Sequence, residues 1–401
     1  MQVRVRVRPL GVWLHRWLGL LMAGFLIVVG LTGSLLAFNT ELERVFAPQL
    51  FAHPRAAPKL DLATLAQKAQ QQVPHARLQA VTLTEPDQVS AWFVSEKDPA
   101  TGGERPLGFT EFFVDPWTGL ELGRRQRGAL SQGLVNLMPF IYEIHWTLLM
   151  SSIGQWTLGI VALAWSIAAF VSFGLTLPST RHAFWRRWKP AWQIKRGASR
   201  FRLYFDLHRA GGLWLWALLF VFAWSSVMMN IRPLYEPVMR TLFDYRSPLE
   251  SLERPLPQPR PHPRLSWHDA QTAGHRLMAQ QARQLGFTFG MPLSLMYFPE
   301  AGAYLYEVRG SDDLFERAPK GGGTSVVFDG DTGELRELSR PTGERLGNTM
   351  ESWLYALHMA RVFGRPYQVL VCLTGLLVAV LSVTGVYIWL RKRAARRPHA
   401  A

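Results

Sequence analysis

The residues Leu14-His15-Arg16-Trp17-Leu18-Gly19 open the first long apolar stretch of the chain, and Leu207-His208-Arg209-Ala210-Gly211-Gly212 open the third. Both segments contain Leu-His-Arg, with a glycine four residues after the histidine. The two histidines are 193 residues apart (15 to 208) in a chain of 401. This repetition predicts that the chain consists of two related halves.

Two further motifs recur at a second spacing. The stretch Phe113–Gly119 matches Val327–Gly333, and each predicts a strand followed by a turn that Asp begins and Gly closes in the left-handed region. Ile141-Tyr142-Glu143-Ile144-His145 likewise matches Leu354-Tyr355-Ala356-Leu357-His358, 213 residues later (145 to 358). The longer spacing fits an insertion in the Pro-rich stretch Pro248–Pro263, which predicts an extended linker.

Four apolar stretches have the roughly 20 residues that a helix needs to cross about 30 Å of hydrocarbon. They predict transmembrane helices at residues 12–38, 154–177, 207–230 and 367–390. The first stretch is too long for the apolar core of a signal peptide, and Ala37-Phe38-Asn39 lacks the small residues of a cleavage site. We therefore interpret it as a membrane anchor.

The distribution of basic residues predicts the orientation. Of the 44 Lys and Arg residues, 18 lie in residues 1–16, 178–209 and 391–401, where Asp206 is the one acid. Basic residues concentrate on the cytoplasmic side of membrane proteins, so these segments and both termini are expected in the cytoplasm. The net charge of +15 is explained by these flanks. It requires no nucleic acid partner, and the lipid bilayer is the partner that the sequence indicates.

Each half thus reads as helix, outer domain, helix. Because each half begins and ends on the same side, the two repeats are expected to be parallel. A helix followed by alternating strands predicts an α+β module in each outer domain, with the helices at Leu60–Gln72 and Trp267–Leu285 and strands such as Gly108–Val114 and Ala303–Val308. The full set of predicted segments is a cytoplasmic N-terminus (1–11), the first span (12–38), outer domain 1 (39–153), the second span (154–177), a cytoplasmic loop (178–206), the third span (207–230), outer domain 2 with the Pro-rich linker (231–366), the fourth span (367–390) and a cytoplasmic tail (391–401).

This arrangement, with Leu-His-Arg at the membrane entry and an Asp-x-x-Thr-Gly turn in the second module, resembles the PepSY-associated transmembrane family. The resemblance covers nearly the whole chain apart from the Pro-rich linker and the Arg-rich tail. The family includes iron-regulated inner-membrane proteins and siderophore-iron reductases such as the ferrioxamine reductase. The resemblance implies a haem-containing reductase of the bacterial inner membrane, with periplasmic PepSY-like α+β domains and delivery of electrons to ferric iron on the periplasmic side.

Four of the eleven histidines form repeat-matched pairs at the membrane boundaries: His15 with His208 near the cytoplasm, and His145 with His358 near the periplasm. A two-fold axis along the membrane normal places equivalent residues opposite each other, so each pair is a candidate for the two axial ligands of one haem b. The single cysteine, Cys372, excludes disulfides and thioether-linked haem within the chain. The alternative is that these histidines are interfacial residues without a cofactor.

Residues near these histidines are candidates for contacts with a haem. A glycine one turn after each cytoplasmic histidine makes room for a porphyrin, an arginine next to each is a candidate partner for its propionates, and two arginines after His358 are candidates for propionates or for an anionic ferric chelate. These residues are Gly19, Gly212, Arg16, Arg209, Arg361 and Arg365. The first repeat has no arginines at positions equivalent to the last two, so the outer site is not symmetric.

The leading hypothesis is a di-haem b electron-transfer protein that reduces a ferric siderophore, or another ferric chelate, at the periplasmic face. The cytoplasmic segments are too short for a flavin or nicotinamide domain, so quinol or a separate cytoplasmic reductase is the expected electron donor. One alternative is a haem or siderophore transporter, although no ionisable residue lies mid-span in the four predicted helices. Another is a non-enzymatic scaffold or regulator whose periplasmic domains bind peptides.

Overall fold

The computed structural model describes residues 7–96, 103, 105–314 and 323–395, so the predictions for residues 1–6 and 396–401 concern parts of the chain outside the described residues. The chain forms two compact units. A helical unit contains Met1–Phe38, Ile141–Pro237 and Leu357–Ala401, and a sheet unit contains Asn39–Phe140 and Val238–Ala356. Each unit is therefore assembled from both halves of the sequence.

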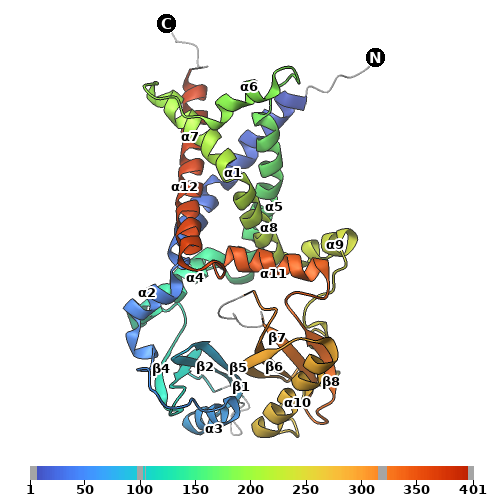
Figure 1. Cartoon of the computed structure of the whole chain (residues 1–401). Coiled ribbons are helices and arrows are strands. Elements are labelled where there is room, and N and C mark those ends of the chain that lie inside the picture. The colour runs from blue at the N-terminus through green and yellow to red at the C-terminus, as the bar shows by residue number, and fades with distance from the viewer. Residues whose placement is uncertain (1–6, 97–102, 104, 315–322, 396–401) are drawn as a thin grey trace. The chain divides into compact units, whose positions relative to one another are not determined.

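The helical unit contains the apolar helices (Figure 1). Among the described residues, three helices are long and apolar enough to cross a membrane: α1 (Val7–Leu36), α5 (Ser151–Thr176) and α12 (Gly364–Ala394). The number rises to four if the bent pair α7 (Arg200–Trp214) and α8 (Trp216–Asn230) forms one span. The three unbroken helices coincide with the predicted segments 12–38, 154–177 and 367–390, whereas the third predicted helix differs.

That third segment, predicted as one helix over 207–230, is two helices that meet at an angle of 71°. Gly211 and Gly212 weaken the last turn of α7, because glycine is a poor helix former. On the two sides of the break, the indole of Trp214 donates to Trp192 O at 3.0 Å, and the indole of Trp216 donates to Ala169 O at 2.7 Å. As a result α7 packs against α12 while α8 packs against α5.

Helices α1 and α12 cross at two glycines. A Cβ placed at Gly30 would lie 2.6 Å from Gly375 O, and one placed at Gly375 would lie 2.5 Å from Gly30 O. Beside the crossing, Ser34 Oγ donates to Cys372 O at 2.9 Å. Small residues permit this close approach of the two backbones, as is common between membrane helices.

Two short helices, α4 (Leu137–Thr147) and α11 (Leu346–His358), precede α5 and α12. A tight turn follows each of them, with left-handed residues at Leu148 (φ 53°) after α4 and at Ala360 (φ 52°) after α11. At the first turn, a Cβ on Gly154 would lie 1.5 Å from Thr147 O, so only glycine fits there. These turns place His145 and His358 at the C-terminal ends of their helices.

The sheet unit is built on one antiparallel sheet of eight strands in the order β4-β3-β2-β1-β5-β6-β7-β8 (Figure 1). The strands are β1 (Ala76–Glu85), β2 (Gln88–Ser95), β3 (Glu111–Val114), β4 (Glu121–Arg125), β5 (Phe289–Phe298), β6 (Ala303–Gly310), β7 (Thr324–Asp329) and β8 (Leu335–Ser339). The sequence predicts two separate modules, but the structure joins them where β1 pairs with β5. The pairing covers backbone groups that would otherwise form an open edge on each four-stranded half.

Helices α3 (Leu62–Gln72) and α10 (Trp267–Leu285) pack on this sheet, close to their predicted bounds. Asp61 caps α3 by accepting from Thr64 N, and Ser266 forms a capping box with Asp269 at the start of α10. Residues from both halves form one hydrophobic core, including Val81 and Leu295. The remaining described helices are α2 (Asn39–Phe46), η1 (Pro48–Leu50), η2 (Leu130–Gln132), η3 (Leu134–Asn136), α6 (Phe184–Trp188), η4 (Lys189–Trp192), α9 (Arg232–Leu242) and η5 (Glu250–Leu252).

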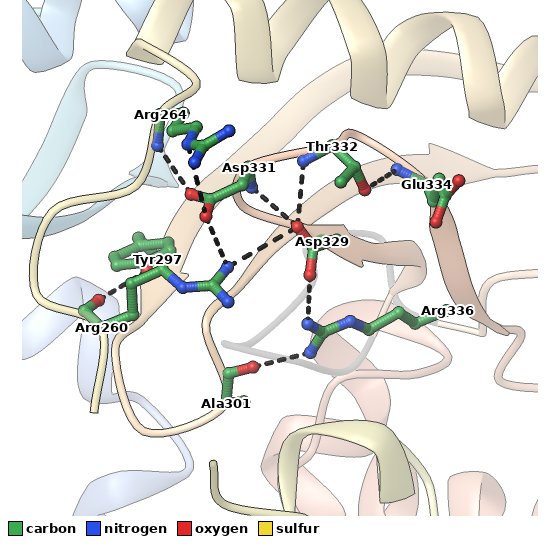
Figure 2. A network of polar contacts seen from close by, with 9 residues as sticks. All are labelled: Arg260, Arg264, Tyr297, Ala301, Asp329, Asp331, Thr332, Glu334 and Arg336. Atoms are coloured by element: carbon green, nitrogen blue, oxygen red, sulfur yellow. Dashed lines mark hydrogen bonds and ion pairs between the residues drawn. The ribbon is translucent and has the colours of Figure 1, made fainter. Parts of the chain in front are cut away.

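The predicted Asp turn of the second repeat forms the polar network in Figure 2. Asp329 accepts hydrogen bonds from the backbone N of Asp331 at 2.8 Å and of Thr332 at 3.0 Å. Arg336 of β8 pairs with Asp329 at 2.5 Å. Arg260, from the Pro-rich linker, pairs with Asp331 at 3.0 Å. The turn therefore also fastens the linker to the end of the β7–β8 hairpin.

Candidate functional site

The helical unit brings the four repeat-matched histidines together in the predicted pairs. The ring centroids of His15 and His208 lie 6.0 Å apart, with an angle of 61° between the ring planes. Those of His145 and His358 lie 6.3 Å apart, at 67°. The spatial pairing is thus as the repeat indicates, while ligation of a cofactor stays a prediction.

The two pairs lie near opposite ends of α1. His15 is in the first third of this helix, whereas Thr32, which contacts His145, is near its end. The 17 residues from 15 to 32 correspond to about 25 Å along a helix that rises 1.5 Å per residue. We call His15 and His208 the inner pair, and His145 and His358 the outer pair.

Hydroxyl groups contact both histidines of the outer pair. His145 Nδ1 lies 2.9 Å from Thr32 Oγ1 of α1, and His358 Nδ1 lies 2.7 Å from Ser225 Oγ of α8. Thr32 and Ser225 are 193 residues apart (32 to 225), the same spacing as between His15 and His208. Sequence reasoning did not select these hydroxyls as site residues, although the repeat spacing was a signal that could have found them.

The inner pair has unequal surroundings. His208 Nδ1 lies 2.9 Å from Leu381 O and 3.3 Å from Thr384 Oγ1, both on α12. His15 Nδ1 is buried and has no hydrogen-bond partner among the described residues. One imidazole of this pair is therefore held by the protein through Nδ1, and the other is not.

Two glycines that sequence reasoning missed lie against histidine rings. A Cβ at Gly33 would lie 3.0 Å from His145 Cε1, and a Cβ at Gly385 would lie 3.1 Å from His208 Cε1. The predicted glycines behave differently, because a Cβ at Gly19 or at Gly212 would meet no atom within 4 Å. The space beside these two residues is open, and their contact with a porphyrin stays a prediction.

The predicted propionate partners differ in their surroundings. Arg209 donates to Asp206 Oδ1 at 2.8 Å and to Pro190 O at 2.7 Å. Asp206 is fully buried and also accepts from Arg202 at 2.9 Å, so this arginine pair neutralises a buried carboxylate. Arg16 forms no hydrogen bond or ion pair with the part of the chain that the structure describes.

The two arginines that follow His358 lie where α12 begins. Arg361 is half-buried in the turn between α11 and α12, and Arg365 is exposed in the first turn of α12. Their contact with propionates or with an anionic chelate stays a prediction.

The geometry of both pairs fits a metal held between two imidazoles. Two imidazoles on opposite sides of one metal, with metal–nitrogen bonds of about 2.0 Å, have ring centroids roughly 6.3 Å apart. The observed separations of 6.0 and 6.3 Å agree with this value. In the described residues no group of three or more His, Cys, Asp or Glu side chains is placed to hold an ion. Two imidazoles alone suit a metal whose other ligands come from a macrocycle, as in haem.

Residues 12–392 match the model of a protein family described as the PepSY-associated TM region. No curated protein matches the chain. The matched region includes both histidine pairs and nearly all of the two units, and it identifies a membrane protein in contact with the lipid bilayer.

Proposed function

The chain belongs to the PepSY-associated transmembrane family, and we propose that it is a di-haem b electron-transfer protein of the bacterial inner membrane that reduces a ferric chelate. The observation that carries the proposal is the separation of the two imidazoles in each pair, 6.0 and 6.3 Å, at two sites along one helix bundle. A haem b at each site would supply a one-electron Fe(III)/Fe(II) couple, which no side chain provides for repeated transfer.

The predicted site residues have different roles in this proposal. His15 with His208, and His145 with His358, would hold the two iron atoms, and the open space at Gly19 and Gly212 would admit the inner macrocycle. Arg16, which has no partner among the described residues, is the better placed of the two predicted propionate partners. Arg209 is already engaged by the buried carboxylate of Asp206. The inner site would thus bind propionates asymmetrically.

The substrate we propose is a ferric siderophore or another ferric chelate at the periplasmic face. Such ligands hold Fe(III) through hard oxygen donors, which bind the softer Fe(II) less well. One electron added to the Fe(III) chelate yields Fe(II), and no covalent bond of the chelator breaks. A quinol, by losing two electrons and two protons, would reduce two ferric ions, and a cytoplasmic reductase is the other donor class. Arg361 and Arg365 are the proposed contacts for an anionic chelate.

We place the inner pair at the cytoplasmic side and the outer pair at the periplasmic side, in four spans arranged as two parallel repeats. The basic residues that flank α1, α7 and α12 support this orientation. The repeat is supported by two sets of equivalent site residues, His15 with His208 and Thr32 with Ser225, because the residues of each set are 193 positions apart. It is also supported by the two halves of the sheet, each a helix followed by four antiparallel strands.

The proposal is tested first by the visible spectrum of the detergent-purified protein, before and after reduction with dithionite. We expect a Soret band and haem b absorption equivalent to two haems per chain. Absence of haem after expression with adequate haem supply would contradict the proposal and favour a scaffold or regulator. Reoxidation of the reduced protein by a ferric hydroxamate chelate, with Fe(II) trapped as it forms, then separates a reductase from a transporter, for which binding without reoxidation is expected.

Histidine replacements test the pairing. His145→Ala and His358→Ala should each remove about half of the haem, and so should His15→Ala and His208→Ala, because each pair holds one iron. Combining both replacements of one pair should remove no more than either alone. Loss of both haems, or of neither, from every single replacement would contradict the assignment.

A further inference from the structure

Each hydroxyl at the outer pair makes two polar contacts shorter than 3.0 Å, and a second helix carbonyl lies farther away, Val29 O at 3.4 Å from Thr32 Oγ1 and Phe222 O at 3.1 Å from Ser225 Oγ. Thr32 Oγ1 lies 2.7 Å from Val28 O, one turn earlier in α1, and 2.9 Å from His145 Nδ1. Ser225 Oγ lies 2.6 Å from Val221 O, one turn earlier in α8, and 2.7 Å from His358 Nδ1. The two hydroxyls thus have the same set of neighbours: a helix carbonyl and an imidazole nitrogen.

A count of hydrogens decides which tautomer each imidazole adopts. A hydroxyl has one hydrogen to donate, and a carbonyl oxygen can only accept. If the hydroxyl donated to Nδ1, no hydrogen would lie between the hydroxyl and carbonyl oxygens, which are only 2.7 and 2.6 Å apart. Both contacts are satisfied together only when the hydroxyl donates to the carbonyl and Nδ1–H donates to the hydroxyl. In a neutral imidazole this leaves Nε2 without a hydrogen.

We propose that Thr32 and Ser225 are matched positioning residues, which hold His145 and His358 in the Nδ1–H tautomer so that each Nε2 lone pair is free to bind iron. This inference rests on the proposed function. Metal-ligating histidines commonly donate the other ring N–H to a protein oxygen, which fixes the ring and strengthens it as a ligand. Here the carbonyl of the preceding helical turn orients the hydroxyl, and the hydroxyl orients the imidazole.

The inner pair shows how the arrangement differs between the two sites. His208 Nδ1 lies 2.9 Å from Leu381 O, an acceptor only, so it also carries the hydrogen. His15 Nδ1 has no such partner among the described residues. The outer site therefore has two oriented imidazoles and the inner site has one. We expect the outer site to bind haem more tightly.

Thr32→Val and Ser225→Ala test the proposal in the full-length protein. Valine has the shape of threonine without the hydroxyl, so Nδ1–H of His145 would lose the Thr32 oxygen, which is its acceptor at 2.9 Å. Each variant should lower the haem affinity of the outer site by about 10- to 100-fold. Each should also raise the midpoint potential of that haem, because a less electron-rich imidazole stabilises Fe(III) less. In both variants the affinity and the midpoint potential should change at the outer haem, and the inner haem should be unchanged. Thr32→Ser should restore wild-type behaviour.

Ser226→Ala is the matched control. Ser226 lies next to Ser225, and its hydroxyl donates to Phe222 O at 2.8 Å, whereas its hydrogen bonds among the described residues include none with a histidine. Ser226→Ala, like Ser225→Ala, removes a serine hydroxyl from the same turn of α8, and it should leave the midpoint potentials of both haems unchanged. Nitrogen-15 chemical shifts of labelled histidine in the haem-free protein give a second measurement: the Nδ1–H tautomer is expected for His145 and lost in Thr32→Val.

The outcomes separate this inference from the proposed function. Wild-type protein without haem contradicts the proposed function. Wild-type protein with two haems, but with unaltered affinity and potential in both Thr32→Val and Ser225→Ala, overturns the positioning role alone. Equal effects from Ser226→Ala and Ser225→Ala would also overturn it, because they would reflect a general effect of hydroxyls on α8.

Discussion

Single glycines set how closely the histidine rings approach their helices. Gly33 on α1 and Gly385 on α12 leave space that a methyl group would take from the rings of His145 and His208. If the pairs hold the proposed haems, Gly33→Ala should displace the His145 ring and lower the affinity of the outer pair for haem by about 10-fold or more, and Gly385→Ala should do the same at the inner pair. Haem content per chain, with the potential of the remaining haem, identifies which site is lost.

Gly174→Ala is the control for these replacements. Gly174 lies in the apolar helix α5, where an added Cβ would meet no atom within 4 Å. It should leave both haems in place. If Gly33→Ala and Gly385→Ala also retained both haems with unaltered spectra, the close approach of backbone and ring would have no role in ligation.

Asp329 provides a residue-scale prediction for the sheet unit. Burial raises the pKa of this carboxyl, but hydrogen bonds from Thr332 N and Asp331 N and the ion pair with Arg336 outweigh it and lower the pKa from 3.8 to about 2. A lowered pKa stabilises the fold above the ordinary value, and this contribution is lost as the pH falls from about 4 to 2. The melting temperature should therefore fall over that range, and less so in Asp329→Asn.

The comparison is made by thermal melting of the detergent-solubilised protein at pH 5, pH 3 and pH 2. Asp244→Asn is the control, because the Asp244 side chain is 74% exposed and its pair with Arg345 is 3.4 Å long. An exposed pair of this kind contributes little. If the melting temperature had the same pH dependence in wild type and in Asp329→Asn, the Asp329 carboxyl would not be the group whose titration lowers stability.

The residue scale also shows what the sequence could predict. His15, His145, His208 and His358 are recognisable because the repeat matches them across the chain, and the structure places them in the expected pairs. Gly33 has no such signal, since its repeat equivalent at the 193-residue spacing is a serine. Its importance depends on which ring packs against it, and that is decided by the tertiary structure.

At the scale of elements, the crossing of α1 and α12 depends on Gly30 and Gly375. A Cβ at either position would meet the backbone oxygen of the other helix at 2.5–2.6 Å, and backbone cannot rotate away as a flexible side chain can. We expect Gly30→Ala and Gly375→Ala to force the helices apart and to cost about 1–3 kcal/mol of stability. Unfolding in a denaturing detergent measures this cost.

Gly24→Ala serves as the control on the same helix, because a Cβ there would meet no atom within 4 Å. Thr32 lies half a turn beyond Gly30 on α1, so a shift of α1 should also loosen the contact with His145. Gly375→Ala should therefore lower the stability and, if the outer pair holds the proposed haem, the haem occupancy of that pair. Stability equal to that of Gly24→Ala would contradict the crossing as a close contact.

Elements differ in how well the sequence predicts them. The amphipathic helix Trp267–Leu285 is predicted with its observed bounds, because Ser266 and Asp269 supply a local start signal and Gly286 a local stop. The break at Leu215 and the pairing of β1 with β5 are not predicted. The first depends on indole contacts with Trp192 and Ala169, and the second joins residues more than 200 positions apart. Neither leaves a local pattern.

At the scale of the whole molecule, the continuous sheet constrains the number of membrane crossings. β1 and β5 pair directly, so the segments before α5 and after α8 must lie on the same side of the membrane. An even number of crossings must therefore separate them. Because α5 supplies one, we infer that the bent pair α7–α8 supplies the second, despite its angle of 71°. We therefore propose four spans and not three.

Cysteine labelling tests this topology in a Cys372→Ala background, since Cys372 is the sole cysteine. Gln71 of α3, Gln193 after η4 and Gln280 of α10 are all exposed, and each is replaced singly by Cys. With four spans, a membrane-impermeant maleimide added to cells with a permeabilised outer membrane should label the positions 71 and 280, and should label 193 only after lysis. With three spans, positions 193 and 280 would react together and 71 would react from the opposite side. That result would be incompatible with the pairing of β1 and β5. Labelling of position 193 alone in unbroken cells would agree with four spans, but it would reverse the orientation that the basic flanks indicate.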